Sequence, residues 1–230
     1  MMIKNKFYLS FHLRRWLLSC LLFLLYSCQD NNPILPATTH TKQDSLKAQQ
    51  GLLNAYKHIS EIEPEIKTGD LITRTGNDFT SESLRLLNRR NTTYSHCGIA
   101  SIENDTVFVY HALGGEFNPD QRLRKDPFKV FASPLENRGI GLFRFNQPLM
   151  LSPVLDTVKS WKNAGLTFDM DFDLTTNDKM YCAEFVAKAY SAGTQNILKF
   201  NTSRIKDFVF IGVDDVFMNP NAHIIKRIKY

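Results

Sequence analysis

The sequence predicts an α+β fold, because helical patterns stand on both sides of a run of strand-like segments. The strand-like segments are rich in β-branched and aromatic residues and are separated by turn-forming residues. They lie at about 71–75, 98–102, 105–112 and 141–145, and further ones lie between 205 and 230. No internal repeat is present. We therefore expect an antiparallel sheet packed against helices.

Helices are predicted both before and after these strands. Apolar residues recur at roughly helical spacing between about 44 and 60 and indicate a helix packed on the domain; they are Leu46, Leu53, Tyr56 and Ile59. A short helix is predicted over 79–90. A third begins at Ser152, a good N-cap followed by Pro153, and ends at Gly165.

The clearest amphipathic pattern runs from about 181 to 192. Its apolar residues fall at positions i, i+3, i+4, i+7 and i+8, and they are Cys182, Phe185, Val186, Ala189 and Tyr190. This spacing places them on one stripe of a helix, which is predicted to be buried.

The first 27 residues are typical of an export signal. Lys4, Lys6, Arg14 and Arg15 form a positive start, and the apolar stretch that follows is shorter than the roughly 20 residues that span a bilayer. The stretch ends in Ser27 and Cys28, which resembles a lipobox, so Cys28 is predicted to carry a lipid anchor. An ordinary secretory signal with a chance cysteine is the alternative.

Three regions are predicted along the chain: a lipoprotein signal peptide over 1–27, a flexible, proline-broken tether over 28–43, and one globular domain over 44–230. Without the signal, the chain carries 24 basic and 23 acidic residues. Since nucleic-acid binding needs Lys and Arg concentrated on one face, and none is evident, we exclude that class of partner.

Cysteine usage argues against a disulfide framework. Once Cys20 leaves with the signal and Cys28 is lipidated, only Cys97 and Cys182 remain. A single bridge between these two is disfavoured but stays open. No CxxC or HxxxH pair is present, so neither a metal nor another cofactor is expected.

Cys182 is the candidate nucleophile, because it opens the predicted helix over 181–192. The partial positive charge of a helix N-terminus favours thiolate over thiol, and the backbone N–H of Cys182 can face a developing oxyanion. Local sequence alone also fits a buried core cysteine.

Histidines supply the candidate base and its orienting partner. His96 lies at the start of a predicted strand, just after a polar loop, and its imidazole can pair with the Cys182 thiol. Cys97 points to the opposite face of that strand and is predicted to fill the core. His111, in the next strand, is the candidate acceptor for the other ring nitrogen of His96. Glu116 is the alternative for that role.

Six segments together resemble the permuted NlpC-type cysteine hydrolases of the YiiX/YebB-like group. They are Gly69-Asp-Leu-Ile-Thr-Arg-Thr, Tyr94-Ser-His-Cys-Gly-Ile, Val109-Tyr-His-Ala, Phe168-Asp-Met-Asp-Phe, Tyr181-Cys-Ala-Glu-Phe-Val-Ala-Lys-Ala-Tyr and Val213-Asp-Asp-Val-Phe. The resemblance implies a papain-like α+β fold and a Cys182–His96 dyad. The family more often has glutamate at the position of His111, although histidine there resembles ordinary NlpC-type enzymes and the lecithin-retinol acyltransferase group.

The resemblance implies hydrolysis of an amide or related acyl bond through an acyl-enzyme. With the predicted anchor on Cys28, we expect the enzyme in the bacterial cell envelope, acting on a cell-wall peptide or an aminoacyl amide. A lipid-directed acyltransferase or thioesterase using the same dyad is one alternative, and a non-catalytic envelope ligand-binding module is another. Glu184, which also matches the family pattern, is predicted to be structural and to pair with Lys188.

Overall fold

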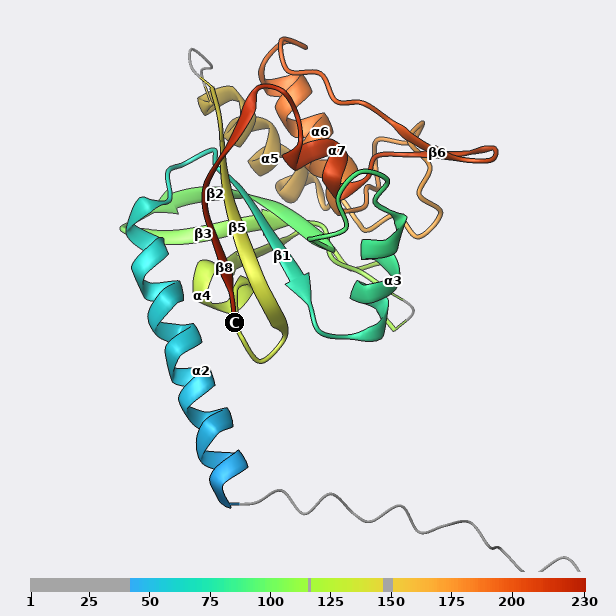
Figure 1. Ribbon diagram of the computed structural model, residues 1–230. Coiled ribbons are helices and arrows are strands. Elements are labelled where there is room, and N and C mark those ends of the chain that lie inside the picture. The colour runs from blue at the N-terminus through green and yellow to red at the C-terminus, as the bar shows by residue number, and fades with distance from the viewer. Residues whose placement is uncertain (1–41, 116, 147–150) are drawn as a thin grey trace, which may run out of the picture. The chain divides into compact units, whose positions relative to one another are not determined.

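A six-stranded antiparallel sheet forms the centre of the fold (Figure 1). The computed structural model describes residues 42–115, 117–146 and 151–230, so the predicted signal over 1–27 and most of the predicted tether lie outside the described residues. The helices are α2 (Lys42–Ile62), a 3-10 turn (Glu63–Glu65), α3 (Phe79–Leu87), α4 (Phe128–Phe131), α5 (Ser152–Ala164), α6 (Cys182–Gly193) and α7 (Val213–Phe217).

The strands are β1 (Leu71–Gly76), β2 (His96–Glu103), β3 (Thr106–His111), β4 (Arg124–Pro127), β5 (Asn137–Phe145), β6 (Ser203–Ile205), β7 (Phe208–Phe210) and β8 (Ala222–Lys229). The large sheet has the order β4-β3-β2-β1-β5-β8, and β6 and β7 form a separate hairpin. Every pairing between these strands is antiparallel. The predicted α+β class with an antiparallel sheet is confirmed.

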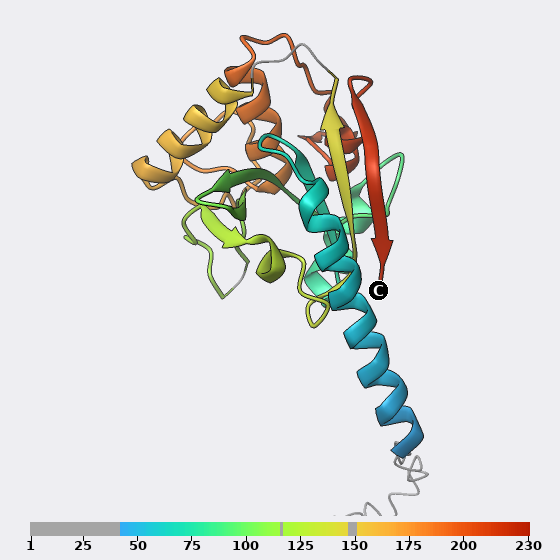
Figure 2. The same ribbon diagram turned by 90° about the vertical axis from the view of Figure 1, so that its left-hand side faces the viewer.

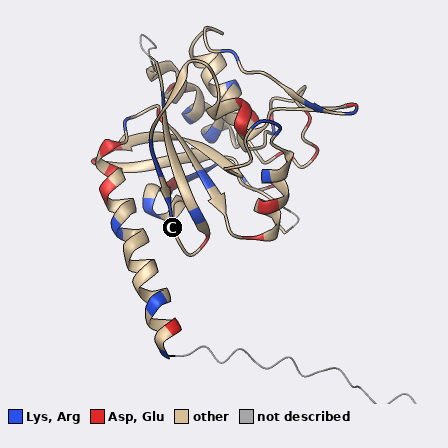
Figure 3. Cartoon of the chain, viewed as in Figure 1, with Lys and Arg blue, Asp and Glu red and all other residues tan. Residues whose placement is uncertain are grey.

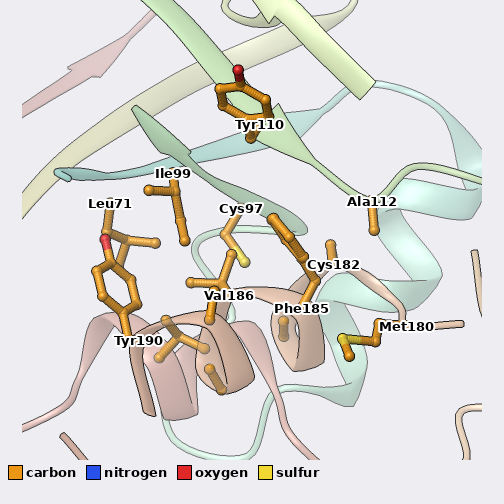
Figure 4. Close-up of a cluster of buried hydrophobic side chains, with 14 of the residues drawn as sticks. Leu71, Cys97, Ile99, Tyr110, Ala112, Met180, Cys182, Phe185, Val186 and Tyr190 are labelled. Atoms are coloured by element: carbon orange, nitrogen blue, oxygen red, sulfur yellow. The ribbon is translucent and has the colours of Figure 1, made fainter. Parts of the chain in front are cut away.

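One face of the sheet packs on α5 and α6, which lie side by side in both views (Figures 1 and 2). The stripe predicted on 181–192 is buried as expected, and Figure 4 shows Phe185, Val186 and Tyr190 of α6 facing Leu71 of β1 and Ile99 of β2. α6 also buries its other faces, including Glu184. Because residues 182–187 are all buried, the first residue of the helix is held in a fixed position against the sheet.

The opposite face of the sheet packs on α4 and on the C-terminal part of α2. The helix predicted over 44–60 is present, but its predicted packing is wrong for most of its length. Leu46, Leu53 and Tyr56 are exposed, and only Ala55, Ile59 and Ile62 are buried. Only the last two turns reach the sheet, so the earlier apolar residues have nothing to pack against.

The cap predicted for the helix after residue 151 is also wrong. Ser152 is the first helical residue and Leu151 is the N-cap, with no side-chain cap hydrogen bond. Pro153 still lies in the first turn, where its missing N–H costs no hydrogen bond. Gly165 ends the helix as predicted, in the left-handed conformation with φ of 81°.

None of the helices within the described residues combines the length and the apolar character that a bilayer crossing requires.

A buried ion pair joins the start of β1 to the end of β5. Asp70 is 1% exposed, and Arg144 donates to both of its carboxylate oxygens, Nε to Oδ1 and Nη2 to Oδ2, each at 2.7 Å. The Lys67 amide donates to Oδ2 as well, at 2.7 Å. This bidentate geometry fixes the turn before β1 against the sheet.

Substituting Arg144→Leu should lower the free energy of unfolding by about 3 kcal/mol, because it leaves the Asp70 carboxylate buried without its counter-ion. Urea unfolding of the purified chain measures this change. Lys226→Leu is the matched control, since it removes a cation from the neighbouring strand where Lys226 pairs with half-exposed Glu65. That control should change stability little. An equal loss of unfolding free energy in both variants would contradict the stabilising role given to the buried Asp70–Arg144 pair.

Candidate active site

Cys182 lies at the N-terminus of α6, as the sequence predicts. Tyr181 is the N-cap, and its hydroxyl accepts a hydrogen bond from the Ile211 amide at 2.7 Å, which ties the start of the helix to the segment before α7. The Tyr181 amide donates to Glu184 Oε2 at 3.3 Å, and Lys188 Nζ lies 2.8 Å from Glu184 Oε1, the predicted pair. The Cys182 amide has no acceptor within the helix because it is the first residue.

His96 is the first residue of β2 and is 6% exposed. It lines the same narrow cavity as Cys182, a space of about 50 Å³ between α6, β2 and the end of α3 that we call the Cys182 cavity. The structure thus brings the two predicted residues to one site from positions far apart in the sequence. Among the described residues, the hydrogen bond of the His96 ring is to His111, with none to the Cys182 thiol.

His111 meets His96 where the sequence predicts. His96 Nε2 and His111 Nδ1 are 2.9 Å apart. Gly98 permits this approach, since a Cβ there would lie 2.6 Å from Val109 Cγ1 and 3.0 Å from His111 Cβ. Both imidazoles also contact the ring of Phe131. Glu116, the alternative partner, lies outside the described residues.

Asp126 adds a further hydrogen bond to this contact, so that His96, His111 and Asp126 form a row of hydrogen-bonded side chains. The sequence did not predict the part played by Asp126. His111 Nε2 is 3.0 Å from Asp126 Oδ2, and Arg124 Nη2 is 2.7 Å from the same oxygen. A carboxylate only accepts hydrogen bonds, so His111 Nε2 carries a proton and Nδ1 of the neutral ring does not. His96 Nε2 must then donate to His111 Nδ1, which leaves His96 Nδ1 unprotonated and free to act as a base.

The electrostatics keep both imidazoles neutral. Burial lowers the pKa of His96 well below its ordinary value, and the positive charge of Arg74 adds to this effect. Burial lowers the pKa of His111 to about 4, although the hydrogen bond to Asp126 acts in the opposite direction. For Asp126, the hydrogen bond from His111 and the charge of Arg124 outweigh burial, so the pKa of that carboxyl is lowered.

Cys97 lies on the face of β2 opposite His96, as predicted, and is fully buried in the core (Figure 4). Cys97 and Cys182 are both free thiols, so the disulfide left open by the sequence is absent from the structure. A hydrogen bond from the Cys97 thiol lowers the pKa of Cys182, against the effect of burial. Burial raises the pKa of Cys97 well above its ordinary value. The acidic thiol of the pair is therefore that of Cys182.

Among the described residues, no Asp, Glu, Lys or Arg side chain lines the Cys182 cavity. Most of the lining side chains are apolar, among them Leu84, Leu87, Leu113, Phe168, Phe172, Phe210, Ile211 and Val213. Such a surface excludes water from the thiol and favours an apolar group close to the reacting bond. Within the described parts of the chain, no group of three or more His, Cys, Asp or Glu side chains is placed to hold a metal ion.

A comparison with known protein families identifies the family of this chain. Residues 65–209, more than half of the chain, match the family described as permuted papain-like amidase enzymes, YaeF/YiiX, C92 family. The chain belongs to this family. It is therefore a permuted papain-like cysteine hydrolase, and the YiiX-like resemblance predicted from its motifs is confirmed.

A solved structure shares the fold. It is the crystal structure of YiiX from Escherichia coli O157:H7, described as a metalloprotein, which matches at 18% identity with a TM-score of 0.58. The match covers 71% of this chain and 98% of that chain. No curated protein matches the chain.

Proposed function

We propose that the chain is an envelope-anchored cysteine hydrolase that cleaves an amide bond, with Cys182 as the nucleophile, His96 as its base and His111 as the orienting residue. One observation carries this proposal: Cys182 and His96 line one cavity with mainly apolar walls, and the contacts of His111 leave His96 Nδ1 free to accept a proton. The amidase family supports the reaction class.

The reaction follows from these positions. As the Cys182 sulfur bonds to the carbonyl carbon of the amide, its thiol proton passes to His96 Nδ1. The carbonyl oxygen takes up negative charge, and the N–H of Cys182 stabilises it. The imidazolium then protonates the leaving amine as the C–N bond breaks. Water, deprotonated by His96, attacks the thioester and releases the acid and the free thiol.

Asp126 acts in this proposal as a positioning residue, because it touches His111 and does not line the Cys182 cavity. By accepting the Nε2 proton of His111, it selects the tautomer that keeps His96 Nδ1 basic. Arg124 holds the Asp126 carboxylate in place. In a catalytic triad, one acceptor orients the catalytic imidazole. Here His111 orients His96, and Asp126 in turn orients His111.

The substrate we propose is a cell-wall peptide or an aminoacyl amide with an apolar group beside the scissile bond. The apolar lining of the cavity also favours a second candidate, a lipid-directed acyltransferase or thioesterase that places the end of an acyl chain there. Incubation of the purified chain with muropeptides and, separately, with phospholipid vesicles distinguishes the two. Cleaved muropeptides support the first candidate, and released or transferred fatty acid supports the second. If neither substrate changes, both candidates fail.

Anchoring through Cys28 is tested separately from catalysis. Substituting Cys28→Ala should move the protein from the membrane fraction to the soluble fraction, because the predicted lipid is lost. Immunoblotting of fractionated cells and incorporation of a labelled fatty acid measure the change. Cys20→Ala is the matched control and should keep the label. Continued lipid labelling of the Cys28→Ala protein would refute the anchor.

A further inference from the structure

A second hollow, open to solvent and of about 550 Å³, adjoins the Cys182 cavity. Three arginines line it, Arg89 and Arg90 from the segment after α3 and Arg204 from β6, together with Ser203 and Asp215. We call it the arginine groove. Figure 3 shows basic residues on the connection between α3 and β2 and on the β6–β7 hairpin, and acidic residues at the start of α7.

Within the described residues, hydrogen bonds of the protein engage the carboxylate oxygens at the groove, apart from Asp214 Oδ1, which is buried without a partner. Asp215 Oδ2 accepts from the Ser203 hydroxyl and from the Gly212 amide, each at 2.8 Å, and Asp215 Oδ1 lies 3.2 Å from Arg90 Nη2. The buried Asp214 carboxylate accepts the amides of Arg89 and Arg90 at 3.0 and 2.6 Å. These contacts fix the backbone that carries the arginines.

Two of the three guanidinium groups have no such partner. In the part of the chain that the structure describes, the side chains of Arg89 and Arg204 form neither an ion pair nor a hydrogen bond. Two unpaired cations that face one hollow repel each other, so an anion between them is stabilised. The planar guanidinium fork matches the oxygen spacing of carboxylate and phosphate.

The arginine groove and the Cys182 cavity share a wall. Asn88 lines the cavity and Arg89, the next residue, lines the groove; on the other side, Val213 lines the cavity and Asp215 lines the groove. The Asp214 amide donates to Asn88 Oδ1 at 3.4 Å and joins the two segments. The two spaces are therefore neighbours, bounded in common by residues 88–89 and 213–215.

We infer that the arginine groove binds an anionic group of the substrate, a carboxylate or a phosphate, while an apolar group of the same molecule fills the Cys182 cavity. This inference rests on the proposed function for the position of the scissile bond. It identifies the substrate class as amphiphilic anions. Neutral amides of the same shape should bind more weakly.

The test measures binding without turnover, in the full chain carrying Cys182→Ala. Calorimetry in low-salt buffer compares N-octanoylglycine, its neutral amide N-octanoylglycinamide, and octyl phosphate. We expect the two anions to bind at least about tenfold more tightly than the neutral amide. Adding Arg89→Gln and Arg204→Gln should remove that preference. Adding Lys47→Gln and Lys229→Gln, which removes the same charge from α2 and β8, should keep it.

Each result has a consequence. Tighter binding of the carboxylate identifies a carboxylate-bearing substrate, and tighter binding of the phosphate a phosphate-bearing one. Equal affinity for charged and neutral probes, no binding of any probe at millimolar concentration, or a preference that survives the Arg89→Gln and Arg204→Gln changes would overturn the inference. Labelling of Cys182 in the unmodified chain by an acyl-directed thiol probe tests the proposed function independently, so failure of one is distinguishable from failure of the other.

Discussion

Substituting Cys182→Ala should reduce kcat by about 10⁴-fold or more, because the side chain that we propose forms the acyl-enzyme is absent. The measurement uses the substrate found by product analysis. The same variant should lose the covalent adduct that an acyl-directed thiol probe forms, as seen by mass spectrometry of the intact protein. Because alanine is smaller than cysteine, the substitution enlarges the cavity and is expected to lower stability. Thermal unfolding is therefore used to check that the variant is folded.

Cys97→Ala is the matched control, since it removes the other free thiol from the same core. It should leave the adduct in place, while raising the pKa of Cys182 by removing the hydrogen bond that lowers it. Alkylation of Cys182 should follow its thiolate, with a midpoint below the ordinary value of 9.0, and that midpoint should rise in Cys97→Ala. Labelling confined to Cys97, or turnover by Cys182→Ala, would refute the nucleophile.

The sequence predicts the parts of the site whose elements have a clear local signal. The helical stripe that begins at Cys182 specifies a buried helix, and the β-branched and aromatic residues that follow His96 and precede His111 specify two neighbouring strands. The structure brings His96 and His111 together across that pair of strands. Local pattern and tertiary position agree here because these elements lie in the core, where the apolar residues that mark them in the sequence are buried.

Asp126 could not be predicted in the same way. It lies in β4, an edge strand of four residues whose sequence Arg-Lys-Asp-Pro has no apolar alternation. The strand forms because β3 offers an open edge, a tertiary cause that local sequence does not carry. α7 was missed for a similar reason, since five residues are too few to show a helical period. For Asp126, the only local signal was an acidic residue two positions after Arg124, in a segment for which the sequence predicts no other role.

Substitution of Asp126 is nevertheless expected to have a large effect on catalysis, although the residue is two contacts away from the thiol's base. Asp126→Leu should lower kcat by between about 10² and 10⁴-fold and leave KM nearly unchanged, because the carboxylate controls a tautomer and does not line the Cys182 cavity. Without an acceptor at His111 Nε2, the proton of the neutral ring can move to Nδ1. His111 then donates to His96 Nε2, and the proton on His96 moves to Nδ1, where it blocks transfer from the thiol.

Asp126→Asn separates this tautomer effect from simple loss of charge. The same oxygen of Asp126 contacts Arg124 and His111, and the guanidinium of Arg124 only donates. It should therefore hold the amide oxygen of the asparagine at that position, so that His111 Nε2 still finds an acceptor. We expect kcat of Asp126→Asn to stay within about tenfold of the unmodified chain, since the hydrogen bond loses its charge assistance but keeps its direction.

Adding Arg124→Leu to Asp126→Asn should then reduce kcat to the level of Asp126→Leu, because the amide is free to turn and present its NH₂ group to His111 Nε2. ¹⁵N NMR of the imidazoles reads the cause directly: His96 Nδ1 should be unprotonated in the unmodified chain and in Asp126→Asn, and protonated in the other two variants. A merely structural role for Asp126 would lower activity in step with thermal stability and leave the tautomer of His96 unchanged. Equal kcat in Asp126→Asn with and without Arg124 would show that the guanidinium does not direct the proton.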